Sequence, residues 1–238
     1  MTLHRYANFS SSEIWKLTKK GRGKTEYFGA PALTYIKEKQ LELRLGRSLS
    51  TETNSKTTNW GTFLEAIAFD KMGLEFSLVS KQRYAHKYVD RWVGMPDILN
   101  ADLVGDIKCP FTLKAFCEVV DAMSEDNPGE ALKSLTGQGE TGSHYYWQIV
   151  SNAILCDRDV GGLFVYVPYK SELDHIRESA GYYPDQNKVS FIQFANDSDL
   201  PYLIEGNHYK NFNACIFEIP KEDKEFLTER VIKAVEML

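Results

Sequence analysis

The stretch that decides the fold is GMPDILNADLVGDIKCPF, residues 94–111. Its pattern predicts two short strands joined by a turn at residues 100–102, where Asn, Ala and Asp follow one another. Successive side chains of a strand point to opposite faces. Asp106 and Lys108 should therefore share one face, while Ile107 points the other way into a core.

Pairing of the two strands would bring Asp97 close to Asp106. Two carboxylates and an ammonium on one rim suit a hard divalent cation and an attacking water. An Asp-x-Lys pair also occurs on ordinary half-exposed strands, which is the alternative interpretation. The apolar neighbours Leu103 and Val104 predict a largely buried strand, where charges are costly unless they are paired or bound to a metal.

Composition predicts an ordinary globular protein, because 43% of the 238 residues are hydrophobic and 26% are charged. No apolar run approaches the roughly 20 residues that cross a bilayer, and residues 1–13 lack the apolar core of a signal peptide. We therefore expect a cytoplasmic protein without a membrane partner. The four cysteines show no metal-binding doublet and are expected to be buried, reduced thiols: Cys109, Cys117, Cys156 and Cys215.

The net charge of −5 argues against a protein that coats DNA. It argues less against a nuclease, because a site that gathers carboxylates for metals also makes a chain more acidic. Basic residues do gather near the start of the chain, at Lys16, Lys19, Lys20, Arg22 and Lys24. A solvated lysine-rich helix end and a Gly-Arg-Gly loop that approaches a phosphate explain this stretch equally well.

Two further helices carry candidate site residues. The helix expected at residues 60–72 places Glu65 among small and apolar neighbours, so its carboxylate should face inward or into a cleft. The alternative is a glutamate at the edge of the apolar face. The amphipathic helix expected at residues 144–156 has a polar side, which matters only if it faces Asp97 and Asp106: His144, Tyr145, Gln148, Ser151 and Asn152.

The rest of the chain predicts one α/β domain with a mixed central sheet flanked by helices. Its parts are a helical segment at about 1–58, a catalytic core at about 59–220 and a closing helix at 221–238. Within the core we expect strands at 162–169, 188–195 and 213–219, and a loop bordering the site at 121–143.

Several of these blocks, in this order, resemble the lambda exonuclease/YqaJ-like viral recombination nucleases of the PD-(D/E)xK superfamily. WGTFLE is similar to the helix that carries the catalytic glutamate, GMPDI to the Pro-Asp strand, and DIKCPF to the (Asp/Glu)-x-Lys strand. YYWQ resembles the later helix with its glutamine, and SSSEIWKL with KKGRGK resembles the opening helix and arginine loop. The resemblance covers most of residues 10–157 and implies a single nuclease domain.

The resemblance implies roles for the matching residues. Asp97 and Asp106, with the carbonyl of Ile107, would bind Mg²⁺ or Mn²⁺, two ions in all, and Glu65 would complete the metal shell directly or through water. Lys108 would position the attacking water and stabilise developing charge, and Gln148 would orient Lys108 or the water. These five side chains form the implied catalytic set. Arg22 would hold a terminal 5′-phosphate, and Ser12 and Lys24 are the other implied substrate-binding residues.

The resemblance also implies an activity and partners. The expected protein is a phage or prophage exonuclease of the bacterial cytoplasm that digests linear double-stranded DNA from its 5′ end. It would leave a 3′ overhang for a single-strand annealing protein, and a ring-shaped homotrimer is expected. Two alternatives remain: an endonuclease or repair nuclease of the same superfamily, and an inactive DNA-binding module.

Overall fold

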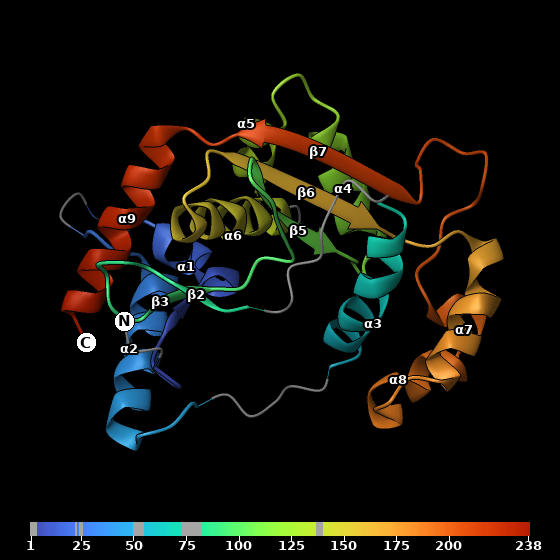
Figure 1. Ribbon diagram of the computed structural model, residues 1–238, viewed down its shortest axis with the longest axis horizontal. Helices are drawn as coiled ribbons and strands as arrows, with labels where there is room; N and C mark the ends of the chain where they lie inside the picture. Colours follow the sequence, from blue (N-terminus) through green and yellow to red (C-terminus); the bar gives the residue numbers. More distant parts are fainter. Residues whose placement is uncertain (1–3, 22, 24–25, 50–54, 73–81, 137–139) are drawn as a thin grey trace.

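The computed structural model describes residues 4–21, 23, 26–49, 55–72, 82–136 and 140–238 (Figure 1). Its larger sheet is mixed, as predicted, with the strand order β4-β5-β6-β7. The middle pair, β5 and β6, is parallel, and each outer strand is antiparallel to its neighbour. The four strands are β4 (Ile98–Leu99), β5 (Leu103–Lys108), β6 (Val160–Tyr166) and β7 (Phe212–Glu218).

Strand β5 separates the two hydrophobic clusters of the protein. It pairs with β6 from Leu103↔Val160 to Lys108↔Val165, and every residue of β5 except Lys108 is buried. Val104 packs in one cluster and Ile107 in the other, because successive side chains leave opposite faces of the sheet. Asp106 therefore lies on the face of Val104.

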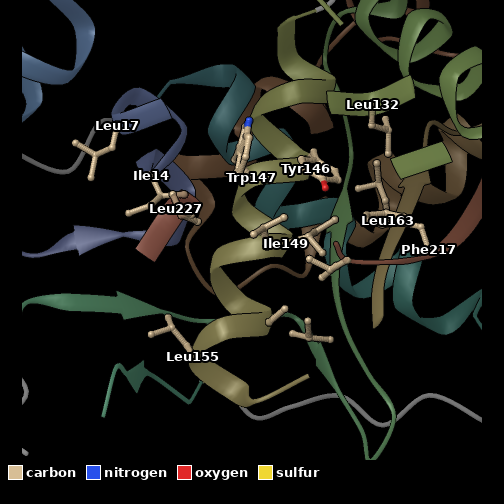
Figure 2. Close-up of a cluster of buried hydrophobic side chains, with 14 of the residues drawn as sticks. Ile14, Leu17, Leu132, Tyr146, Trp147, Ile149, Leu155, Leu163, Phe217 and Leu227 are labelled. Atoms are coloured by element: carbon tan, nitrogen blue, oxygen red, sulfur yellow. The ribbon is translucent and has the colours of Figure 1, made fainter. Parts of the chain in front are cut away.

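The connection from β5 to β6 is helical and covers that face. It consists of α4 (Leu113–Met123), α5 (Pro128–Ser134) and α6 (Glu140–Cys156). Figure 2 shows α6 crossing the cluster, with Tyr146 and Ile149 directed toward the sheet residues Leu163 and Phe217. Tyr146 and Phe217 stack with ring centroids 5.7 Å apart. A parallel strand pair needs such a crossover, and it presses α6 against β5.

The opposite face of the sheet is covered by α3 (Lys56–Asp70), with α7 (Leu173–Gly181) and α8 (Gln186–Gln193) outside it (Figure 1). Two short 3₁₀ helices, η3 (Lys170–Glu172) and η4 (Asp197–Asp199), flank α7 and α8. The side chain of Ser55 caps α3 by accepting a hydrogen bond from the backbone N–H of Thr58.

A smaller sheet, with the order β1-β3-β2, lies beside the N-terminal helices. Its strands are β1 (Phe9–Ser10), β2 (Tyr84–Ala85) and β3 (Trp92–Gly94), and the nearby helices are η1 (Ser11–Glu13), α1 (Trp15–Thr18), α2 (Ala30–Leu45) and α9 (Lys221–Glu236). Arg230 of α9 is 2% exposed and ties this region to the end of the chain. Its guanidinium donates to the carbonyl of Leu17, and at 2.8 Å to that of Lys19.

Two predictions about secondary structure were wrong. Residues 188–195, predicted as a strand, belong mainly to α8, because Val189 and Ile192 are three positions apart and both enter the core on one helical face. The segment 121–143, predicted as a loop, contains α5 and the start of α6, where the side chain of Asn127 caps α5 by accepting from the N–H of Glu130. No helix in the described part of the chain is both long and apolar enough to cross a membrane.

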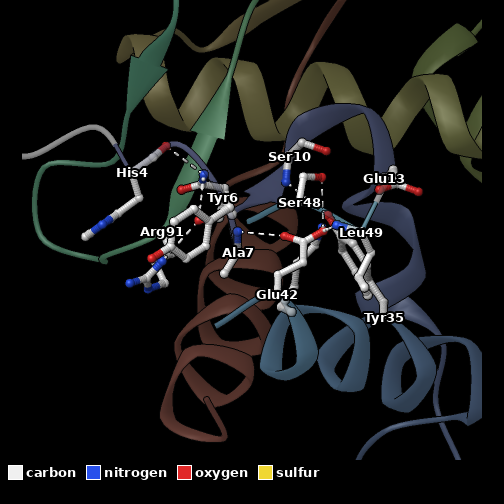
Figure 3. Close-up of polar contacts among 12 residues, drawn as sticks. His4, Tyr6, Ala7, Ser10, Glu13, Tyr35, Glu42, Ser48, Leu49 and Arg91 are labelled. Atoms are coloured by element: carbon white, nitrogen blue, oxygen red, sulfur yellow. Dashed lines mark hydrogen bonds and ion pairs between the residues drawn. The ribbon is translucent and has the colours of Figure 1, made fainter. Parts of the chain in front are cut away.

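A buried carboxylate on α2 holds the segment that leads into β1 (Figure 3). Glu42 is 3% exposed and accepts hydrogen bonds from the N–H of Ala7 at 2.7 Å and from Lys39 at 3.1 Å. Ala7 has a φ of 55°, in the left-handed region, so this bond fixes a strained turn. Burial alone would raise the pKa of Glu42, but the bonds from Ala7 and Lys39 outweigh it and lower that pKa.

Glu42→Gln is expected to lower the free energy of unfolding by about 1–3 kcal/mol at pH 7, because the charge-assisted bonds are lost. The lowered pKa means that the charged form stabilises the fold above the ordinary pKa, and that this contribution is lost as pH falls through the folded pKa. Urea unfolding at pH 7 and at about pH 3.5 should therefore show a smaller difference at the lower pH. Glu38→Gln, at a half-exposed position of the same helix, is the control; an equal loss there would contradict this role.

Candidate active site

The hairpin of β4 and β5 places Asp97 beside Asp106, as the sequence predicted. Ile98 pairs with Gly105, so Asp97 continues β4 next to Asp106. The carboxylate of Asp97 accepts the backbone N–H of Ile107 at 2.8 Å. The turn between the strands is closed by Asn100, whose side chain accepts two backbone N–H groups at 2.8 Å each.

Asp106 and Lys108 of β5 form a close ion pair. Asp106 is fully buried, and the Lys108 ammonium lies 3.5 Å from its Oδ2. Burial raises the pKa of Asp106 to about 7; the Lys108 charge opposes this rise and the Asp97 charge adds to it. Burial would lower the pKa of Lys108, but the charges of Asp106 and Asp97 outweigh it and raise that pKa. The ring of Tyr145 lies 5.4 Å from the Lys108 ammonium.

The polar side of α6 faces this pair. The amide of Asn152 donates to Oδ1 of Asp106 at 3.5 Å, and Tyr145 lies beside Lys108. Gln148 lies on the same helix and lines a cleft together with Asp97. Asn152 and Gln148, on the polar side of α6, thus lie next to Asp106 and Asp97, which is the arrangement that would give this side a functional role.

The cleft has a volume of about 440 Å³ and opens onto the Asp97 side of the site. It is lined by Ser10, Ser11, Ser12, Arg83, Val93, Gly94, Met95, Asp97 and Gln148. Ser12 is exposed, and its hydroxyl lies 3.2 Å from that of Ser10. The N–H of Ser10 donates to the Tyr35 hydroxyl at 3.0 Å, so α2 holds this wall (Figure 3).

Arg22 and Lys24, predicted to contact DNA, lie outside the described residues. Arg83 lines the cleft but was not predicted as a site residue. Its only sequence signal is a basic residue just before the β-prone Tyr84, and that signal does not show which surface it joins. Asn152 was predicted on the polar side of its helix, but without a partner.

Glu65 lies on α3, the helix that packs in the hydrophobic cluster on the opposite face of the sheet from α6. Its side chain is half-buried, and it approaches the end of β5 at Cys109. Burial raises the pKa of the Cys109 thiol, and the charges of Glu65 and Asp97 raise it further. Among the residues that the structure describes, no three His, Cys, Asp or Glu side chains gather as a metal-binding group. The metal roles predicted for Glu65 and for the carbonyl of Ile107 stay predictions.

The residues present nevertheless suit a hard cation at Asp106. Its Oδ2 is buried and, apart from the Lys108 ammonium at 3.5 Å, has no hydrogen-bond partner within the described part of the chain. Asp97 and Asp106 repel one another, and a cation would relieve that repulsion more fully than Lys108 alone. The available donors are oxygens, which Mg²⁺ and Mn²⁺ prefer.

No family model matches the chain, and no curated protein matches it in sequence. Solved structures match it in fold. An alkaline exonuclease, LHK-Exo from Laribacter hongkongensis, matches in its complex with dAMP with a TM-score of 0.59 and 13% identity, over 98% of this chain and 88% of that chain. A second LHK-Exo structure matches with a TM-score of 0.55 and 13% identity, over 98% and 91% of the two chains.

A phage-related exonuclease from Haemophilus somnus 129PT matches with a TM-score of 0.61 and 16% identity, over 97% of this chain and 92% of that chain. These similarities extend over nearly the whole of both chains, so they concern the complete fold and not one motif. The chain therefore has the mixed α/β fold of the alkaline and phage-related exonucleases, in agreement with the resemblance to lambda exonuclease/YqaJ-like nucleases found in its sequence.

Proposed function

We propose that this protein is a metal-dependent exodeoxyribonuclease that hydrolyses linear double-stranded DNA from the 5′ end. The single observation that carries the proposal is the grouping of Asp97, Asp106 and Lys108 at the edge of an open cleft. Oδ2 of Asp106 is buried and, apart from the Lys108 ammonium at 3.5 Å, has no hydrogen-bond partner among the described residues, and such an atom is costly in a purely structural role. The fold shared with known exonucleases supports the same activity.

In this proposal, Asp97, Asp106 and the Ile107 carbonyl hold Mg²⁺ or Mn²⁺, and Glu65 completes the shell directly or through water. When bound, two such ions supply stabilisation of the charge on the attacking and leaving oxygens. Lys108 holds the attacking water and donates to the phosphate oxygens as their charge grows. Gln148, on the cleft wall, orients Lys108 or that water.

The 5′ polarity and the partners follow from the resemblance in sequence. Ser12, Arg22 and Lys24 would contact a terminal 5′-phosphate, and Ser12 lines the cleft, as that role requires. The product would carry a 3′ single-stranded overhang for a single-strand annealing protein in phage-type recombination. A homotrimer would enclose the DNA.

Linear and covalently closed duplexes provide the decisive experiment. End-labelled linear DNA, with or without a 5′-phosphate, is incubated with Mg²⁺, and the products are sized over time. Progressive shortening from the 5′ end, faster on phosphorylated ends and absent on circles, is expected. Cleavage of circles would favour an endonuclease instead. DNA binding without hydrolysis in any metal would favour an inactive binding module.

Metal choice is expected to follow coordination geometry. Mg²⁺ and Mn²⁺ should support hydrolysis, whereas Ca²⁺ should support DNA binding without turnover, because Ca²⁺ accepts looser and larger oxygen shells. Chelation with EDTA should stop the reaction, and Mn²⁺ should restore it. Full turnover in Ca²⁺ would contradict the proposed site.

Arg83→Gln is expected to raise KM for DNA about tenfold with little change in kcat, because a guanidinium in the cleft would bind a phosphate away from the bond that breaks. The slope of log KM against log salt should become shallower by about 1. Steady-state kinetics at several salt concentrations measure both. Arg44→Gln, on an exposed part of α2, is the control; an unchanged KM and slope in Arg83→Gln would remove Arg83 from the substrate path.

A further inference from the structure

Asn152 contacts the central carboxylate of the site but has no role in the function proposed above. It is 1% exposed, on the face of α6 that packs against β5, and its Nδ2 donates to Oδ1 of Asp106. Lys108 approaches the other oxygen, Oδ2. The carboxylate is therefore contacted from two sides, by a neutral amide and by a cation, and its rotation is restricted.

The backbone opposite Asn152 leaves space for its amide because residue 94 is a glycine. A Cβ on Gly94 would collide with Oδ1 of Asn152 and with the hydroxyl of Ser11. A glycine therefore stands at the end of β3, where the amide fits against bare backbone. Oδ1 of Asn152 is buried and has no hydrogen-bond partner within the described residues. The hydrogen bond from its Nδ2 to Asp106 is therefore the contact that explains an asparagine at this position.

The position of Asn152 along the sheet is fixed by the preceding residue. The hydroxyl of Ser151 is 2.8 Å from the hydroxyl of Ser11 and accepts the indole N–H of Trp92, also at 2.8 Å. Ser151 is fully buried, so these bonds restrict the rotation of α6 against η1 and β3. With α6 held in this rotation, the side chain of the next residue, Asn152, lies against Asp106.

We propose that Asn152 is a positioning residue that orients Asp106 so that its Oδ2 is presented to the divalent cation. An amide can do this without adding a charge that would compete for the cation. The inference rests on the proposed function, since orientation matters only if Asp106 binds a metal. Groups that orient metal ligands typically change metal affinity about 10- to 100-fold when they are removed.

The test is Mn²⁺ binding without DNA, measured by calorimetry on the full chain. Asn152→Ala is expected to raise the Kd for Mn²⁺ about 10- to 100-fold. Asn152→Ser, whose shorter side chain does not reach Asp106, should do the same and serves if the alanine variant folds poorly. Asn8→Ala is the matched control: this asparagine is also buried, its Nδ2 donates to the carbonyls of His4 and Tyr6 away from Asp106, and its loss should lower the melting temperature yet keep the wild-type Kd.

The possible outcomes distinguish a failure of the positioning role of Asn152 from a failure of the proposed nuclease function. A wild-type Kd in both Asn152 variants, or an equal loss of affinity in Asn8→Ala, would overturn the positioning role while the nuclease proposal stands. Absence of Mn²⁺ binding and of DNA hydrolysis in the wild type would overturn both. Recovery of kcat in Asn152→Ala at high Mn²⁺ concentration would support positioning if the variant also keeps the wild-type melting temperature in EDTA, because added metal can rescue a merely destabilised fold as well.

Discussion

Asp106→Asn is expected to abolish DNA hydrolysis and to stabilise the metal-free protein. Loss of a single electrostatic element of an active site typically lowers kcat about 10²- to 10³-fold, and loss of a metal ligand should reach at least that range. The stabilisation arises because a buried charge beside Asp97 is replaced by a neutral amide, while the Lys108 ammonium keeps the neighbouring charge of Asp97. An increase of 1–2 kcal/mol would raise the melting temperature by about 2–8 °C.

The raised pKa of Asp106 determines how its contribution to stability changes with pH. The pKa of Asp106 is raised to about 7 in the folded protein, so the folded state keeps a proton that the unfolded chain loses near pH 4. The associated stability is present below the unfolded pKa and is lost as pH rises through about 7. In EDTA, the melting temperature should therefore fall more steeply between pH 4 and pH 8 for the wild type than for Asp106→Asn. Asp102→Asn, in the exposed turn of the same hairpin, should match the wild type.

Lys108→Met is expected to have the largest effect on stability. It leaves Asp97 and Asp106 without their neighbouring cation, and breaking a buried ion pair typically costs about 3–5 kcal/mol. At pH 8 in EDTA the melting temperature should fall by about 6–20 °C, and added Mn²⁺ should restore part of that loss. In saturating Mg²⁺, kcat should still be about 10²- to 10³-fold below the wild-type value, because the metal would not replace the ammonium that is proposed to contact the phosphate.

A double variant separates the two causes. Asp106→Asn with Lys108→Met removes both charges, so it should be more stable in EDTA than Lys108→Met alone. Lys114→Met, on an exposed part of α4, is the control for loss of a lysine. Equal melting temperatures for the single and double variants would show that repulsion between Asp97 and Asp106 does not govern the stability of the site.

Local pattern was sufficient to predict the centre of the fold. The Asn100 turn and the two-residue period of β5 place Asp97, Asp106 and Lys108 together without knowledge of the rest of the chain. Residues 188–195 show the opposite case. Val189 and Ile192 are β-prone, yet contacts with α3 and α7 select a helix, and no local signal records those contacts.

The parts of the site that could not be predicted depend on contacts between distant segments. The polar side of α6 was visible in the sequence, but only the crossover between β5 and β6 presses Asn152 onto Asp106. Arg83 enters the cleft because β2 pairs with β3 next to the serines of β1 and η1. A periodic pattern identifies which face of an element is polar, but it does not identify which other element that face will meet.

The bond from Arg230 to the carbonyl of Lys19 sets an order of events during synthesis. The two residues are 211 positions apart, and a chain leaves the ribosome beginning with its N-terminal end. Asp97 and Asp106 emerge well before α9, whereas α1, which follows the serines of the cleft wall, gains the bond to the Arg230 guanidinium only after α9 has emerged. A nascent fragment that ends before α9 would thus carry Asp97 and Asp106 without a secured cleft wall, so the proposed activity should arise only after α9 has left the ribosome.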